Sequence, residues 1–487
     1  MSGGPMVERF GTSAARRATA WAVAVAMTGA VVACGASGDS SGEATGEEGS
    51  TSVAPEAQHQ ESGDFGDLRG VCGDGDARVD PDEGGTGTDK LYIGVATDRS
   101  SSVRPGLNKE MWDASEAFVS WCNEAGGIGG LQIEPVELDA ALFDVPSAVT
   151  TACHSVFALV GGGWAQDDLQ FTGRDGSDFH RCGLVDIPGY AVSPEKSGSS
   201  GQVQPVPNGA STVSNTWIRR YADLYPEESR KVAIAYADLP ALDQIRQKYV
   251  AAVDDVGLDV VAEIAYPPTG LTDWTPLAQQ VIQSGARTLL WVGEAGNVAS
   301  ALGKLHEQGW DGHALLETNM YDPLLFGQGN AAAEGTVIRQ VVHPVEEADE
   351  WPAVRQYLDV LDQYVPDAKV APLGIQSTSA WLLFAVAANA CIDADDGTIT
   401  RECILEQAAA QTDWSGGGLH APQDPAPYDQ AATGPCDMLM VARDGRFERL
   451  DPKVGTDGDD GFSCPDDGVT RVPALEGRGV IVPGATI

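Results

Sequence analysis

The side chains that usually carry catalysis or bind metals are present in this sequence, but they form no known catalytic or metal-binding motif. The seven histidines are scattered, and no two of them stand four residues apart on one helix. There is no HExxH motif, P-loop or CxxC pair, and the serine-rich run at 197–201 follows a loop rather than a strand, unlike the GxSxG turn of hydrolases. We therefore predict no enzyme, no bound metal and no cofactor. A hydrolase whose catalytic residues meet only in space is the alternative.

Two other kinds of motif imitate ligand sites. Acidic stretches at 74–83, 393–400 and 457–461 are similar to calcium loops, but each lacks the glycine at position six or the glutamate at position twelve. Gly129 and Gly130 are similar to a dinucleotide-binding turn, but they follow a predicted helix rather than a strand. We interpret the acidic stretches as solvated loops, we reject the dinucleotide-binding interpretation, and we assign the tight reversal into the next strand to Gly126 and Gly127.

Cys34 marks an abrupt change of composition. An arginine pair at 16–17 precedes an uncharged run at 18–32, which is typical of a secretory signal peptide and short for a membrane span. The sequence VVAC at 31–34 resembles the lipobox of bacterial lipoproteins. That resemblance implies that residues 1–33 are a lipoprotein signal peptide and that Cys34, lipidated on its sulfur, anchors the chain at the outer face of the cell membrane. An ordinary signal peptide or a buried cysteine is the alternative.

Length, net charge and composition indicate the number of domains and limit the kinds of partner that the protein could bind. The chain has 487 residues, which predicts two or three domains, and 30 basic against 71 acidic residues give a net charge of −41. No basic stripe appears, so we predict no nucleic-acid binding. Residues 34–89 are rich in small polar and acidic side chains and are predicted to be a flexible tether, and 451–487 to be an acidic tail.

The chain has nine cysteines, of which eight remain when the proposed lipidation site Cys34 is set apart. An even number of cysteines in an exported chain predicts disulfides, here four. Proximity along the sequence favours the pairs Cys122–Cys153, Cys391–Cys403 and Cys436–Cys464. The two cysteines that remain would then form the fourth pair, Cys72–Cys182.

Two successive series of alternating strands and helices occupy the middle of the chain. Strands of the first series are predicted at 91–97, 131–138, 157–163 and 183–190. Strands of the second series are predicted at 232–238, 258–266, 288–293 and 313–318. A return strand at 334–342, a helical region to about 411 and a hairpin turning at Asp444-Gly445 follow. Helix-length crossovers between strands predict parallel sheets covered on both faces, so the expected fold class is α/β with two doubly wound lobes.

The stretch WCNEAGGIGGLQIEPVELDA at 121–140 resembles a segment of type I solute-binding proteins, the branched-chain amino acid (leucine) binding family of ABC importers. The order of the later segments FALVGGG, GLVDIPGYAVSP, KVAIAYAD and VARDGRF is similar to that family as well, and the resemblance covers about 90–450. It implies two parallel-sheet lobes that are joined by a three-segment hinge and close around a ligand.

Domain boundaries follow from this resemblance. Crossings between the lobes are expected near 207–210, 335–341 and 411–418. The first lobe would comprise 90–209 and 337–412, and the second lobe 210–336 and 413–450. Ligands of such sheets bind outside the carboxyl ends of the strands, where the two lobes face each other.

The loops after the predicted strands supply the candidate ligand-binding residues. The first of these loops holds Asp98, Arg99, Ser100 to Ser102 and Arg104. The residues selected as ligand contacts are Arg99, Trp164, Gln166, Tyr190, Ala191, Ser193, Asp238, Glu294, Glu317, Asn319 and Tyr321.

In the amino-acid binding members, first-lobe Ser and Thr residues hold the ligand carboxylate, and second-lobe tyrosines with an acid hold its ammonium group. Ser193 and Glu317 match this scheme by position, whereas Trp164 stands in a loop that lacks the expected Ser, and Ala241 stands where a Tyr is frequent. Glu294 together with Glu317 would suit a cationic or amine-bearing ligand.

The resemblance implies a lipid-anchored, monomeric solute-binding protein that delivers a small polar ligand, such as an amino acid or amide, to an ABC permease complex. A ligand-sensing receptor module is the alternative with the same fold. On either interpretation, Glu317→Ala and Tyr190→Ala are expected to weaken ligand binding while leaving the melting temperature nearly unchanged.

Overall fold

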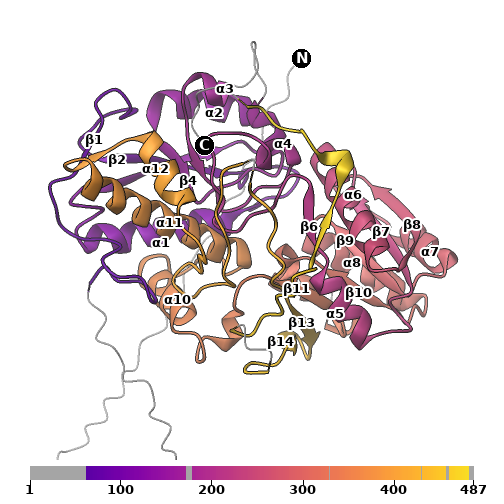
Figure 1. The fold of residues 1–487 in the computed structure, drawn as a ribbon. Coiled ribbons are helices and arrows are strands. Elements are labelled where there is room, and N and C mark those ends of the chain that lie inside the picture. Colours follow the sequence, from indigo (N-terminus) through magenta and orange to yellow (C-terminus); the bar gives the residue numbers. More distant parts are fainter. Residues whose placement is uncertain (1–61, 172–177, 328–329, 429, 457–459, 482–487) are drawn as a thin grey trace, which may run out of the picture. The chain divides into compact units, whose positions relative to one another are not determined.

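Two sheets flanked by helices form two lobes in the computed structural model, which describes residues 62–171, 178–327, 330–428, 430–456 and 460–481 (Figure 1). The sheet of the first lobe has the order β3-β2-β4-β5, and all its neighbouring strands are parallel. Its strands are β2 (Leu91–Thr97), β3 (Ile133–Asp139), β4 (Ala158–Val160) and β5 (Asp186–Ile187). The fold class predicted from the sequence is confirmed.

Alternate side chains of β2 bury against the two faces of this sheet, as the two-residue period of a strand requires. Ile93 and Val95 join a core with helix α1 and helix α11, whereas Ala96 faces a second core with helix α2. The helices of this lobe are α1 (Lys109–Glu124), α2 (Val145–Ser155), α3 (Asp178–Arg181), α4 (Pro194–Ser197), α10 (Pro352–Tyr364), α11 (Pro372–Ala394) and α12 (Arg401–Ala409).

Helix α11 is long and apolar enough to span a membrane, but it forms the centre of the first lobe's core. Most of its side chains are buried, and the rings of Trp381 and Phe118 of α1 stack with centroids 5.4 Å apart. A helix that is apolar on all sides is the one expected inside a protein core.

The sheet of the second lobe has the order β14-β13-β11-β10-β9-β7-β8. Its strands are β7 (Lys231–Ala237), β8 (Asp259–Tyr266), β9 (Thr288–Val292), β10 (His313–Leu316), β11 (Val337–Gln340), β13 (Met438–Arg443) and β14 (Arg446–Asp451). The helices are α5 (Thr216–Leu224), α6 (Pro240–Asp255), α7 (Thr275–Ser284), α8 (Ala295–Glu307) and α9 (Asn330–Ala333). The hairpin of β13 and β14 turns at Asp444 and Gly445, whose φ angles of 51° and 75° suit the twist of the strands.

Short elements complete the chain. Two-residue strands β1 (Arg78–Val79) and β12 (Thr398–Ile399) pair in parallel, and β6 (Thr212–Ser214) pairs antiparallel with β15 (Val469–Arg471). Single 3₁₀ turns lie at Asp167–Phe171, Thr318–Met320, Pro323–Phe326, Val345–Glu347 and Pro473–Leu475.

The second sheet corrects one predicted boundary. Strand β11 (Val337–Gln340) pairs with β10 and β13, so it belongs to the second lobe, although the sequence-based boundary placed residues from 337 in the first. The pairing of β11 cannot be read from its own residues, because a strand of four residues carries too little pattern to select one sheet over the other.

The predicted tether is also wrong for residues 62–89. Phe65, Val71 and Val79 are buried, and Cys72 forms a disulfide with α1. A few apolar side chains and one covalent bond are enough to fix this polar segment to the first lobe. The proposed signal peptide, Cys34 and residues up to 61 lie outside the described residues.

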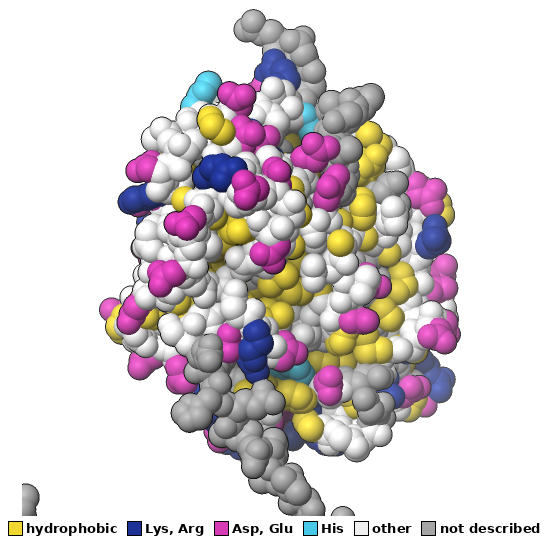
Figure 2. Space-filling model, turned by 60° about the vertical axis from the view of Figure 1, so that its left-hand side comes forward, with side chains coloured by type: hydrophobic (Ala, Val, Ile, Leu, Met, Phe, Trp, Pro, Cys, Tyr) yellow, Lys and Arg dark blue, Asp and Glu magenta, His cyan; other side chains and the backbone are white. Residues whose placement is uncertain are grey.

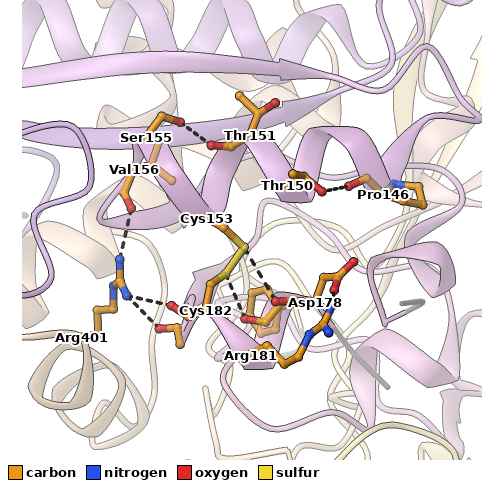
Figure 3. The surroundings of a disulfide bond; sticks show 12 residues. Pro146, Thr150, Thr151, Cys153, Ser155, Val156, Asp178, Arg181, Cys182 and Arg401 are labelled. Atoms are coloured by element: carbon orange, nitrogen blue, oxygen red, sulfur yellow. Dashed lines mark hydrogen bonds and ion pairs between the residues drawn. A yellow bond between two sulfur atoms is a disulfide. The ribbon is translucent and has the colours of Figure 1, made fainter. Parts of the chain in front are cut away.

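Two of the predicted disulfides are confirmed, Cys391–Cys403 and Cys436–Cys464. The other two are wrong, because the structure pairs Cys72 with Cys122 and Cys153 with Cys182. Figure 3 shows why for the second of these: the end of α2, which carries Cys153, lies beside the turn that follows α3 and carries Cys182. Arg401 reinforces the same place by donating hydrogen bonds to the carbonyl oxygens of Cys182 and Val156.

The acidic tail is ordered between 460 and 481 rather than a plain loop. Phe462 and Leu475 are buried, and β15 pairs with β6. The segment then reaches the first lobe, where Arg478 forms an ion pair with Glu195 at 2.9 Å (yellow in Figure 1). The tail therefore contacts both lobes.

Candidate functional site

A cavity of about 260 Å³ lies between the two lobes, at the carboxyl ends of the strands. The loops after β2 and β5 line it from the first lobe, and the loops after β7, β9 and β10 line it from the second. Helix α11 contributes Leu373 and Gln376, and the crossing segment at 206–208 closes one side. The volume is near the lower end of the range for small-molecule sites.

Five of the predicted ligand-binding residues line this cavity: Tyr190, Ala191, Glu294, Glu317 and Asn319. The Tyr190 hydroxyl accepts a hydrogen bond from Asn108 Nδ2 at 3.0 Å, and burial raises the pKa of Tyr190. The Asn319 amide donates to the carbonyl oxygen of Gly293 at 3.1 Å, which joins the loops after β10 and β9.

Three predicted first-lobe residues lie beside the cavity as structural supports instead. Trp164 is buried and its Nε1 donates to the Leu138 carbonyl oxygen at 3.0 Å. The Gln166 amide donates to the Leu142 carbonyl oxygen at 2.9 Å. Ser193 caps α4, since its hydroxyl accepts from the Lys196 backbone N–H at 3.0 Å.

The remaining three predicted residues also fall outside the lining that the structure describes. Arg99 forms an ion pair with Glu137, and Asp238 is exposed to solvent. Tyr321 is buried, and its hydroxyl donates to Glu346. Their position after strands was the basis of the prediction, but Arg99 and Tyr321 are held by Glu137 and Glu346, and the Asp238 side chain faces solvent.

Two buried carboxylates hold the first-lobe loops in place. Asp98 accepts hydrogen bonds from the backbone N–H groups of Leu142 and Ala165, both at 2.7 Å. Asp167 accepts from those of Val192 at 2.6 Å and Ser193 at 2.9 Å. Burial raises the pKa of Asp98 to about 6 and that of Asp167 to about 7. These amides are therefore already occupied by the protein's own acids.

The two acidic residues of the cavity wall are paired with arginines. Glu294 lies 3.1 Å from Arg104, which comes from the opposite lobe. Glu317 accepts from Arg339 at 3.0 Å, and Arg339 also lies 2.6 Å from the buried Asp437. Burial works to lower the pKa of Arg339, but Asp437 and Glu317 raise it above its usual value. The expectation that Glu294 and Glu317 receive a cationic ligand thus loses its basis.

Lys248 is the functional candidate that the sequence analysis missed. It lines the cavity from α6, is 1% exposed, and donates to Asn208 Oδ1 at 2.9 Å and to the Gly209 carbonyl oxygen at 2.6 Å. Burial lowers its pKa from 10.5 to about 7. The signal available in the sequence was a lysine beside Tyr249 on the buried face of an amphipathic helix.

Apolar side chains supply much of the remaining wall. Those from the first lobe and the crossings include Val103, Leu107, Leu142, Val206, Pro207 and Val341. Those from the second lobe include Leu239, Leu242, Ile245, Pro268, Trp291 and Val292. An apolar wall with a few polar groups is the usual composition of a small-molecule site.

Comparisons with solved structures show where this fold occurs. A fatty acid ABC transporter substrate-binding protein from Thermomonospora curvata matches with a TM-score of 0.64 and 17% identity, over 83% of this chain and 98% of the other. A leucine-binding protein from Thermotoga maritima matches with a TM-score of 0.60 and 14% identity, over 74% and 98% of the two chains.

A branched-chain amino acid transporter substrate-binding protein from Streptococcus pneumoniae, in complex with isoleucine, matches with a TM-score of 0.60 and 16% identity, over 74% and 100% of the two chains. A search of curated proteins gives no match. The family model described as periplasmic binding protein matches residues 90–446, which is most of the described chain. The protein therefore belongs to the periplasmic binding protein family and has its type I fold.

Proposed function

We propose that this protein is a lipid-anchored, extracytoplasmic solute-binding protein that delivers a small ligand to an ABC importer. The observation that carries the proposal is the cavity between the lobes, because its wall combines strand-end loops of both lobes with the crossing segments. A ligand held there contacts both lobes at once, so its binding favours the closed arrangement over an open one.

The proposal of an ABC importer as partner is based on the similar structures, whose names describe ABC transporter or transporter substrate-binding proteins. The ligands in those names are a fatty acid, leucine and isoleucine, which share an acid group and an apolar part. The apolar wall of this cavity supports a ligand with such a part.

Binding is tested by thermal unfolding of the mature chain against a panel of amino acids, amides and carboxylic acids. A ligand that binds only the folded state raises the free energy of unfolding by RT ln(1 + [L]/Kd), and the melting temperature rises with it. The variant Leu242→Trp places a large side chain in the cavity and should abolish the shift, whereas Gln283→Trp, an exposed position on α7, should retain it. A shift that Leu242→Trp leaves intact would place the ligand elsewhere, and no shift with any compound would count against the proposal.

The lipid anchor is tested separately. The full-length chain, expressed in a bacterium that processes lipoproteins, should partition with the membrane fraction, and Cys34→Ala should release it to the medium or periplasm. Equal partition of the two chains would contradict anchoring through Cys34.

A further inference from the structure

Among the residues that the structure describes, the charged side chains of the cavity wall form pairs of opposite sign, except for Lys248. Arg104 pairs with Glu294, and Arg339 pairs with Glu317. Lys248 forms no ion pair within 4.0 Å with any carboxylate of the described chain, since both of its hydrogen-bond acceptors are neutral carbonyl oxygens.

The ammonium group of Lys248 has capacity for a further partner. An ammonium carries three N–H donors, and Asn208 and Gly209 account for two of them. Glu317 and Asp167 act on Lys248 from beyond ion-pair distance and favour its charged form, and Arg339 disfavours it. Their sum does not offset the cost of burial, because the pKa of Lys248 is still lowered to about 7. A carboxylate in contact with this group would compensate that cost.

The first lobe offers an incoming anion fewer donors than its loops suggest. The backbone N–H groups of Ala165, Val192 and Ser193 lie in the loops after β4 and β5, but Asp98 and Asp167 already accept hydrogen bonds from them. An acid entering at that end would meet two buried carboxyl groups rather than free amides.

An apolar path leads along α6 to Lys248. Leu242 and Ile245 line the cavity and precede Lys248 by six and three residues, so Ile245 is a neighbour of both Leu242 and Lys248 on the helix surface and lies between them. At 1.5 Å of rise per residue, Leu242 and Lys248 are about 9 Å apart along the helix axis. Val206 and Val341 face the same cavity from the crossings.

We propose that the ligand is an amphipathic carboxylic acid, whose carboxylate pairs with Lys248 and whose apolar chain lies along Ile245 and Leu242. This inference rests on the proposed solute-binding function and specifies its ligand class. It replaces the amine-bearing ligand expected from the two acidic residues, because both of those are already paired.

The test compares three eight-carbon probes of matched shape, octanoate, octanamide and octylamine, by calorimetric titration of the mature chain at pH 6.5. We expect octanoate to bind at least ten-fold more tightly than octanamide and octylamine. Lys248→Met should weaken octanoate binding at least ten-fold and change octanamide binding less than three-fold. Lys304→Met, an exposed lysine of α8 in the same lobe, should leave both unchanged.

Tighter binding of octylamine or octanamide than of octanoate by the unaltered chain would overturn the inference without any variant. An equal loss of octanoate and octanamide binding in Lys248→Met would also overturn it, since it would show that Lys248 only ties α6 to the crossing at Asn208 and Gly209. Either result leaves the proposed function standing if another compound binds and Leu242→Trp abolishes that binding.

Discussion

Arg104 and Glu294 form an ion pair of 3.1 Å between the loop after β2 in the first lobe and the loop after β9 in the second. Both residues line the cavity, and both side chains are partly exposed, at 21% and 31%. Hinge opening would separate the pair, so it contributes to the closed arrangement. Burial raises the pKa of Glu294, while Arg104 opposes that rise.

The first prediction concerns this contact. Arg104→Met should weaken ligand binding about five-fold, since a partly exposed ion pair contributes about 1 kcal/mol and acts here on the closed state. The melting temperature of the ligand-free chain should change little. Titration of Arg104→Met against Arg99→Met makes the comparison, because Arg99 lies in the same loop but pairs with Glu137 of its own lobe. Equal affinities of the two variants would contradict a role of Arg104 in closure.

The second prediction concerns the stability of the second lobe. Glu317→Ala removes one of the two carboxylates that contact the buried guanidinium of Arg339 and should lower the free energy of unfolding by about 3 kcal/mol. The expectation that this substitution would spare the melting temperature is therefore revised. Chemical denaturation of Glu317→Ala and of Glu307→Ala, an exposed acid paired with Lys304, should show a large loss only in the first.

The third prediction concerns pH. The pKa of Lys248 is about 7 in the folded chain and 10.5 in its unperturbed state. Between these values the unfolded chain binds a proton that the folded chain has released, so the free energy of unfolding rises with pH. From pH 7 to pH 9 the wild type should gain about 2 kcal/mol relative to Lys248→Met.

The difference in free energy of unfolding between wild type and Lys248→Met cancels, to first order, the contributions of the other titrating groups. These include Asp167, which acts on Lys248 and has a pKa of about 7. A difference that stays constant between pH 7 and pH 9 would show that Lys248 remains charged in the folded chain. The proposed acid ligand gives a second readout. Its affinity should fall about ten-fold per pH unit above pH 7, because binding requires the protonated lysine.

The fourth prediction concerns the covalent framework. Proteolysis of the unreduced chain followed by mass spectrometry should yield linked peptides for Cys72–Cys122 and Cys153–Cys182. Replacing Cys72 and Cys122 together by Ala should destabilise the chain by up to about 4 kcal/mol, the chain-entropy value for a loop of this length. Linked peptides that join Cys122 to Cys153 would contradict this pairing and support the one expected from sequence proximity.

Much of the fold follows from local sequence patterns. The predicted strand at 91–97 coincides with β2, and that at 232–238 lies within one residue of β7. Buried parallel strands are apolar runs of strand length between helical segments, so their positions are encoded locally. The same logic placed Tyr190, Glu294 and Glu317 at the cavity, because the carboxyl ends of parallel strands meet at one edge.

The sequence by itself determined the order of strands and helices, the two lobes and the loops that face each other. Only the tertiary structure decided how Cys72, Cys122, Cys153 and Cys182 pair, that residues 62–89 are ordered, and which side chains of those loops reach the cavity. Glu294 and Glu317 acquired their arginine partners, and Lys248 its neutral acceptors Asn208 and Gly209, through contacts between segments far apart in the chain. Local periodicity fixes which face of an element is buried, but the partner that each buried charge meets depends on how separate elements pack.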